Sequence, residues 1–188
     1  MKRGLIAAAV VAFAAGSAVA AAAFYALAPA GTATPPAHPA WTEVQWPFPV
    51  DEWGTGKAFH CAAADCGAAV DVYLRAKIGF CDCVNGVADD NELDRLSDFS
   101  LMGGPVATID GGHPISIGWM KGRSRAYAIT GGARAKTSAF AIAFNDHCDA
   151  MVATVVFRHD RPAMIEPSVL RFLNGKTVLD WTTARLAQ

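Results

Sequence analysis

Charged residues are scarce in this sequence. They make up 18% of its 188 residues, and 16 Lys+Arg against 17 Asp+Glu leave a formal net charge of -1. This balance excludes a polybasic nucleic-acid binder, so no nucleic-acid partner is expected. Because 53% of the residues are hydrophobic, a disordered or collagen-like chain is excluded as well. Length and composition fit one globular domain with an ordinary core.

Catalytic motifs are also missing. The sequence has no Gly-x-Ser-x-Gly elbow, no His-Glu-x-x-His pair and no Cys-x-x-Cys redox pair. Gly54-Thr55-Gly56-Lys57 resembles the end of a phosphate-binding loop, but Ala58 follows where a hydroxyl would hold magnesium. No catalytic residue is therefore assigned, and the sequence favours a non-enzymatic role.

Acidic residues are absent before Glu43, and this stretch has the layout of an export leader. Two basic residues, Lys2 and Arg3, precede an apolar run over residues 5–28. As a helix, that run would extend about 36 Å, enough to cross the ~30 Å hydrocarbon core of a bilayer. Ala18-Val19-Ala20 also has the small residues of a signal-peptidase site. Residues 1–28 are thus predicted to be either a cleaved signal peptide or a retained N-terminal anchor.

Residues 29–40 are rich in Pro, Ala and Thr and have nothing to bury. They are predicted to be an extended tether. Either form of the leader exports residues 41–188, which in a Gram-negative cell would lie in the periplasm. The domain would be soluble after cleavage, or held at the inner membrane by residues 5–28. The membrane is therefore an expected partner through the N-terminal segment.

Residues 41–188 are predicted to form a single α+β domain. Residues 70–78 alternate apolar and polar side chains, which is typical of a half-buried strand. Two hairpins are expected after it, one turning at residues 121–123 and one at residues 145–149. The aromatic residues between Trp41 and Cys61 are expected to cover an edge of the core.

Helices are expected on either side of these hairpins. Asp89 or Asp90 is placed to cap an internal helix, and a C-terminal helix is expected to begin at Pro167 and end at Asn174-Gly175 in a left-handed cap. A second C-terminal helix would begin with a capping box at Thr177. The predicted fold is an antiparallel sheet built mostly of hairpins, covered by one internal helix and C-terminal helices.

The cysteines of an exported domain are expected to form disulfides. Cys66 and Cys81 flank the strand at residues 70–78, which would be about 30 Å long, whereas bridged Cα atoms lie within ~7 Å. The spacing therefore favours Cys61 with Cys66, and Cys81 or Cys83 with Cys148. The remaining thiol is predicted to be a buried spare rather than an intermolecular or reactive group.

A metal-handling or thiol-redox protein is the alternative interpretation. Two His-Cys pairs, His60-Cys61 and His147-Cys148, offer the ligands that zinc or copper prefers. The spacing of the cysteines is tighter than in structural zinc sites, and export favours paired sulfurs. Disulfides without a cofactor are accordingly the main prediction.

Two charge clusters stand out. Asp90, Asp94 and Asp98 recur every four residues, which is typical of the solvated face of a helix. No acid lies between Gly111 and Asn145, where the sequence places a basic patch. The patch is either a solvated hairpin or a surface for an acidic protein, anionic lipid or a phosphate-bearing ligand. The members of that patch are Lys121, Arg123, Arg125, Arg134 and Lys136. Together these features predict an exported, disulfide-stabilised accessory or binding module.

Overall fold

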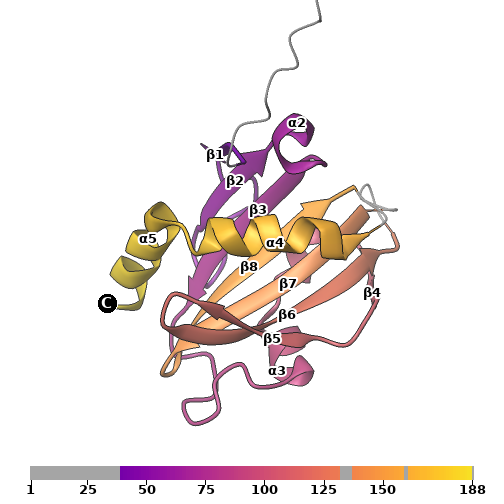
Figure 1. The fold of residues 1–188 in the computed structure, drawn as a ribbon. Coiled ribbons are helices and arrows are strands. Elements are labelled where there is room, and N and C mark those ends of the chain that lie inside the picture. The colour runs from indigo at the N-terminus through magenta and orange to yellow at the C-terminus, as the bar shows by residue number, and fades with distance from the viewer. Residues whose placement is uncertain (1–38, 132–136, 159–160, 188) are drawn as a thin grey trace, which may run out of the picture. The chain divides into compact units, whose positions relative to one another are not determined.

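The computed structural model describes residues 39–131, 137–158 and 161–187. The predicted leader and nearly all of the predicted tether lie outside these residues. Within them, no helix combines the length and the apolar character that crossing a membrane requires. The structure therefore bears on the domain that begins near Trp41 (Figure 1).

Eight strands form one sheet in the described part of the chain. The strands are β1 (Trp41–Val44), β2 (Lys57–Cys61), β3 (Val70–Lys77), β4 (Val106–Thr108), β5 (His113–Ile117), β6 (Met120–Ile129), β7 (Thr137–Asp146) and β8 (Asp149–Phe157). The helices are α2 (Ala63–Cys66), α3 (Asp90–Leu96), the 3-10 helix η1 (Phe99–Met102), α4 (Pro162–Leu173) and α5 (Lys176–Leu186).

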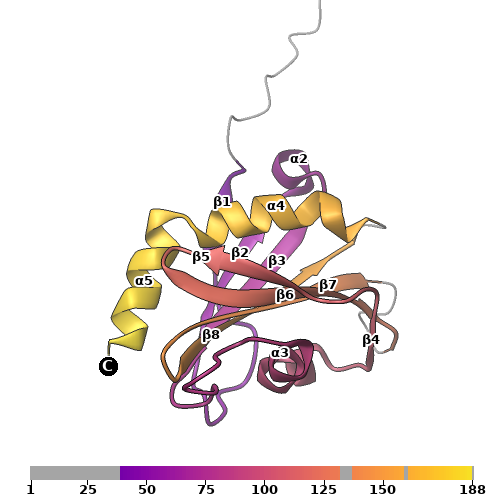
Figure 2. The ribbon, with the colours of Figure 1, turned by 60° about the horizontal axis from the view of Figure 1, so that its bottom comes forward.

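The sheet has the order β1-β2-β3-β8-β7-β6-β4, and β5 pairs with another stretch of β6. Every strand pair is antiparallel. Helices α4 and α5 lie on one face of the sheet and α3 lies on the other (Figure 2). The predicted fold class, an α+β domain with an antiparallel sheet covered by helices, is confirmed.

The face under α4 is closed by large apolar side chains. Ile165, Val169 and Leu173 recur every four residues on α4 and are buried against the sheet. Alternate residues of the central strands, such as Phe144 and Met151, point to this side and are fully buried. This stripe is the usual way in which an amphipathic helix covers a sheet.

Most of the aromatic side chains after Trp41 pack as predicted. The ring of Trp41 stacks on Phe172 of α4 with centroids 4.3 Å apart. On the other face, Phe48 lies edge-to-face on Tyr73 of β3 at 4.8 Å, and Trp46 packs beside both. These rings cover both faces of the core near the edge of the sheet that the β1–β2 hairpin forms.

The face under α3 contains charged side chains, which corrects the prediction of a half-buried β3. Arg75 and Lys77 were expected to face solvent, but they are 3% and 4% exposed. The residues before β2 and the α3 segment cover them, while Leu93 and Leu96 of α3 pack on the same face. Alternation identified the two faces of β3 correctly, but it could not show that both are covered.

The first predicted hairpin turns three residues too late. The structure places the turn at Gly118-Trp119, between β5 and β6, and residues 121–123 lie inside β6. Gly118 has a φ of 57°, which glycine adopts at little cost. Gly122 faces a close approach of β7, since a Cβ there would lie 2.1 Å from the carbonyl oxygen of Ala143. Glycine is needed at position 122 for this close packing and not for a turn. The second hairpin turns where predicted, between β7 and β8.

The C-terminal helices differ from prediction at their ends. Helix α4 begins at Pro162 and contains Pro167, which was predicted to start it. The helix tolerates the lost N–H bond because its apolar stripe is held on the sheet. Asn174 is right-handed, and Gly175 precedes α5 without a capping side chain. The Asn174 amide instead accepts a 2.8 Å bond from the Gly118 N–H, which fixes the helix junction to the β5–β6 turn.

Candidate functional site

The two disulfides lie at opposite ends of the sheet. Cys61 bonds to Cys66 with Cα atoms 6.1 Å apart, beside the start of β3. Cys83 bonds to Cys148 with Cα atoms 4.2 Å apart, at the turn between β7 and β8. This is the pairing that the spacing favoured, with Cys83 as the partner of Cys148. The second bond fixes the loop of residues 79–89 to the tip of the β7–β8 hairpin.

Cys81 is the free cysteine of the described chain, and it is buried as predicted. Its backbone N–H donates to the carbonyl of Cys148 at 3.2 Å, and its Sγ lies 3.2 Å from the carbonyl of His147. Burial, followed by the charges of Glu92 and Asp149, raises the pKa of this thiol to about 11. The thiol is thus held protonated, which is unfavourable for a nucleophile or a metal ligand.

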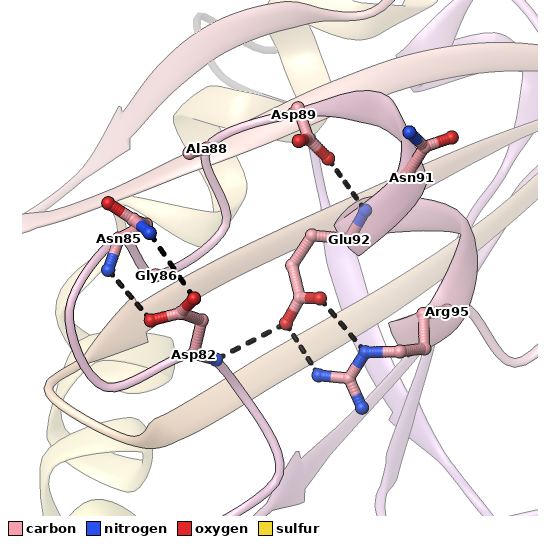
Figure 3. A pocket seen from close by; sticks show the side chains of 8 residues that line it. All are labelled: Asp82, Asn85, Gly86, Ala88, Asp89, Asn91, Glu92 and Arg95. Carbon is pink, nitrogen blue, oxygen red and sulfur yellow. Dashed lines mark hydrogen bonds and ion pairs between the residues drawn. The ribbon is translucent and has the colours of Figure 1, made fainter.

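A pocket of about 300 Å³ opens between the loop of residues 79–89 and α3. Its charged lining residues are three acids and one arginine (Figure 3). The lining residues are Asp82, Asn85, Gly86, Ala88, Asp89, Asn91, Glu92 and Arg95. Gly86 has a φ of 60° and packs against the side chain of Asn145, so the loop is folded tightly onto β7.

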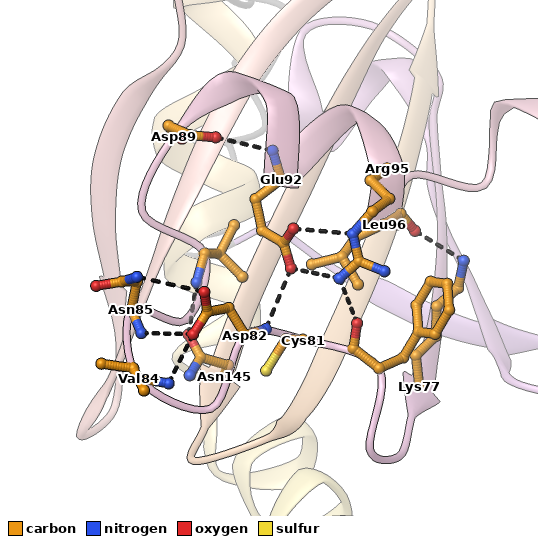
Figure 4. Close-up of polar contacts among 12 residues, drawn as sticks. Lys77, Cys81, Asp82, Val84, Asn85, Asp89, Glu92, Arg95, Leu96 and Asn145 are labelled. Atoms are coloured by element: carbon orange, nitrogen blue, oxygen red, sulfur yellow. Dashed lines mark hydrogen bonds and ion pairs between the residues drawn. The ribbon is translucent and has the colours of Figure 1, made fainter.

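Backbone donors hold the loop side of this pocket. The Asp82 carboxylate accepts the N–H groups of Val84 at 2.7 Å and Asn85 at 3.0 Å, a local turn that aspartate commonly makes (Figure 4). These bonds lower the pKa of Asp82. The Asn145 side chain accepts the N–H of Val87 at 3.1 Å. The loop is therefore held by directional contacts as well as by its disulfide.

An ion pair holds the helix side. Asp89 caps α3 by accepting the N–H of Glu92 at 2.9 Å, as predicted. Glu92 receives two bonds from Arg95, at 2.6 and 2.9 Å, and Arg95 also donates to the Phe80 carbonyl. The bond that Arg95 donates to Glu92 raises the pKa of Arg95. Glu92 and Arg95 are thus paired with each other on the helix side of the pocket, while Asp82 is bonded to backbone donors on the loop side.

A buried charge cluster behind the pocket was missed at the sequence level. Arg75 donates twice to Asp98, both at 2.6 Å, and twice to Asp51, at 2.7 and 2.8 Å. Lys77 lies 2.9 Å from Asp98 and donates to the Leu96 carbonyl at 2.8 Å. The cluster connects β3 to the loop before β2 and to the end of α3. The sequence contains both halves of the cluster, Arg75 and Lys77 in one pattern and Asp98 in the other. Each pattern considered alone predicts a face exposed to solvent.

Two members of the acidic stripe, Asp90 and Asp94 on α3, face the basic patch, which corrects the solvated-helix prediction. Asp90 pairs with Arg123 at 2.5 Å, and Asp94 pairs with Arg125 at 3.4 Å and accepts a bond from the Tyr127 hydroxyl. The two arginines share one strand face, as expected, but acids distant in sequence neutralise them.

Lys121 is the exposed member of the patch that the structure describes. It lies on β6, where a turn had been expected. Arg134 and Lys136 lie outside the described residues. The anionic partner of this patch stays a prediction.

A second polar cluster lies beneath α4. The Ser124 hydroxyl donates to Glu166 at 2.5 Å, and His113 Nε2 lies 3.2 Å from the same carboxylate oxygen. Ser124 is fully buried. A serine that is closed to solvent and bonded to a carboxylate is not placed as a nucleophile, because a histidine base would have to contact its hydroxyl. The cluster anchors α4 to β5 and β6.

The residues of the metal alternative are not brought together. His60 Nδ1 contacts Asp71 at 2.8 Å, while His147 contacts Asp146 at the other end of the sheet. Cys61 and Cys148 belong to different disulfides. Across residues 39–131, 137–158 and 161–187, no three His, Cys, Asp or Glu side chains gather as a metal site.

No protein-family model, curated protein or solved structure matches this chain.

Proposed function

We propose that this chain is an exported accessory or binding module of the cell envelope, stabilised by disulfides. The observation that carries the proposal is the pair of disulfides, which form and persist in oxidising compartments. The leader predicted for residues 1–28 supports the same location. In a Gram-negative cell the module would be periplasmic, either soluble or tethered to the inner membrane by residues 5–28.

The contacts around the pocket support binding over catalysis. Glu92 and Arg95 neutralise each other, and Asp82 is occupied by backbone donors. The adjacent Cys81 thiol is buried with a raised pKa. Side chains that would act as acid, base or nucleophile are thus used to fix the loop. A rigid loop on a sheet scaffold is a common form of recognition surface.

Export can be tested with a reporter that is active only outside the cytoplasm, fused after residue 60. The fusion is expected to be active, and its Ala14→Arg/Ala15→Arg variant inactive, because two charges inside the apolar run oppose insertion. Activity that ignores the charges, or a silent parent fusion, would contradict export. Fractionation then separates the two leader forms: a species that resists alkaline wash is anchored, and a soluble species beginning at Ala21 is cleaved.

Disulfide mapping of the chain from its own cell tests the second half of the proposal. Mass spectrometry without reduction is expected to find the two bonds of the structure and one alkylatable thiol at Cys81 after denaturation. Five free thiols would contradict the proposal. Five free thiols with bound zinc or copper would establish the metal-handling alternative.

A further inference from the structure

Three loop tips meet at one end of the sheet. The register pairs Lys77 with Ala150, Ala150 with Asn145, and Asn145 with Lys121. The end of β3, the β7–β8 turn and the β5–β6 turn therefore lie in a row. The Cys83–Cys148 bond adds the loop of residues 79–89 to the same end.

This end exposes large apolar side chains. Val84 is 90% exposed, Trp119 is 56% exposed and Ile78 is 48% exposed. Because these side chains lie outside the core, their apolar surface contributes little to the free energy of folding. Exposed apolar groups held on rigid turns are typical of interaction sites.

A carboxylate fixes each of these three positions. Asp82 accepts the N–H of Val84 at 2.7 Å. The indole N–H of Trp119 donates to Asp146 at 3.4 Å. Asp149 accepts the N–H of Gly79, next to Ile78, at 2.6 Å. We call these six residues the turn-end surface: Ile78, Val84 and Trp119 with Asp82, Asp146 and Asp149.

The charge of the turn-end surface specifies its complement. Residues 78–89, 118–121 and 145–150 contain four aspartates against Lys121 and His147. Such a surface attracts cationic groups and repels anionic lipid headgroups. Its apolar points require apolar side chains in the same partner.

We propose that the turn-end surface docks a protein segment in which lysine or arginine alternates with apolar side chains. The inference rests on the proposed binding function and names the chemistry of the partner. Three apolar points form a small contact, so the complex is transient, with a dissociation constant on the order of micromolar. Fixed turns keep the entropy cost of binding low.

A titration tests this with the chain as isolated from cells, disulfides intact. The probe is a 14-residue peptide of alternating lysine and leucine, and its counterpart replaces lysine with glutamate. NMR signals of the Trp119 indole N–H and the Val84 and Ile78 methyl groups report binding. The lysine peptide is expected to shift these signals at low salt, with weaker affinity as salt rises. The glutamate peptide is expected to leave them unchanged.

Matched variants locate the contact. Val84→Ser/Trp119→Ser is expected to weaken the lysine peptide about tenfold. Val50→Ser/Met164→Ser removes side chains that are 72% and 67% exposed elsewhere and is expected to change nothing. Because all four are exposed, each variant should fold, which thermal melts confirm.

Charge variants separate attraction from apolar contact. Asp146→Asn/Asp149→Asn keeps the bonds to Trp119 and Gly79 but is expected to weaken binding several-fold and to reduce its salt dependence. Asp180→Asn, on α5, is the control for net charge.

Several results would overturn the proposal: no binding of the lysine peptide, equal binding of the glutamate peptide, or equal loss in the Val50/Met164 control. Vesicles of phosphatidylglycerol that shift the same signals would replace it with a membrane contact. A chain that is exported and disulfide-bonded but ignores the lysine peptide overturns this inference alone, since export and disulfides are measured separately.

Discussion

The two faces of the sheet are covered by different kinds of contact. Under α4, the stripe of Ile165, Val169 and Leu173 meets aromatic and aliphatic side chains. Under α3, the strands present several alanines to Leu93 and Leu96, and ion pairs join the sheet to α3 and to the residue that follows it, Asp98. The first face depends mainly on complementary shapes, with one polar cluster at Glu166, whereas the second depends on several charged partners at particular distances.

This difference separates stability from specificity. Apolar contacts are non-directional, so the α4 face tolerates small shifts. Directional contacts on the α3 face fix where the helix and the loop of residues 79–89 lie, at the cost of desolvating charges. Each face also has its own disulfide, since Cys61–Cys66 joins the apolar core and Cys83–Cys148 holds the loop. The turn-end surface depends on the second set of contacts.

The largest expected effect comes from removing one charge under α3. Asp98→Asn leaves Arg75 and Lys77 buried with Asp51 as their remaining carboxylate. Breaking a buried pair costs about 3–5 kcal/mol of unfolding free energy. Ile165→Val, the control under α4, is expected to cost about 0.5–1.5 kcal/mol. Urea unfolding measures both, and a larger loss for Ile165→Val would refute the contrast between the faces.

The two disulfides should differ in the same direction. Cys83 and Cys148 are 65 residues apart in sequence, against 5 for Cys61 and Cys66. Loop-closure entropy then gives about 4 kcal/mol for the first bond and about 2 kcal/mol for the second. The double serine variant of each pair is compared by thermal melting, which avoids a new free thiol. If the Cys61/Cys66 variant melts lower, chain entropy does not govern these bonds.

The sequence predicted that C-terminal helices cover the sheet, that Cys61 bonds to Cys66, and that Cys81 or Cys83 bonds to Cys148. Alternation identified β3, and the turn residues at 145–149 identified β7 and β8 as a hairpin. Cysteine spacing with strand length narrowed the disulfide pairing to one of two sets. The apolar core can be predicted from local periodicity, because the buried side of a strand or helix is indicated by its own sequence. The hairpin turn at Gly118 was missed because Gly122, a packing glycine, gave the stronger turn signal.

The α3 face could not be predicted, because its partners are distant in sequence. Asp90 and Arg123 are 33 residues apart, and Arg75 and Asp98 are 23 apart. Each charged pattern is compatible with solvent when it is considered alone, and only the fold brings the two together. The turn-end surface could not be predicted for the same reason, since its members come from three separate turns.

A smaller effect is expected from the paired arginines. Arg123→Gln removes the 2.5 Å ion pair to Asp90, which keeps Arg125 at 3.7 Å, and removes the bond to the Gly112 carbonyl. Bonds to charged groups contribute about 1–3 kcal/mol, so the melting temperature should fall measurably. Lys121→Gln, on the same strand face but exposed, is expected to change stability by less than about 0.5 kcal/mol. Equal effects would mean that Arg123 is as free for an anionic partner as Lys121.

The smallest effect is a difference between the faces at acidic pH. The bond from Arg75 lowers the pKa of Asp51 below its ordinary 3.8, and the bond from Arg123 does the same for Asp90. A carboxyl group with a lowered pKa in the folded state stabilises fully above its unfolded value and loses that stabilisation as pH falls through the folded value. The contribution of these two carboxyl groups to stability should therefore be complete above about pH 5 and fall below about pH 4.

Hydrogen exchange can assign that loss to one face. The amides of α3 are expected to lose protection first as the pH falls, while those of α4 persist, because apolar side chains make most of the contacts of α4 with the sheet. Asp51→Asn/Asp90→Asn should flatten the acid limb, and Asp180→Asn, which removes an exposed acid paired with Lys176, should not. If α4 opens before α3 on acidification, the cluster of Ser124, His113 and Glu166 is the acid-sensitive anchor instead.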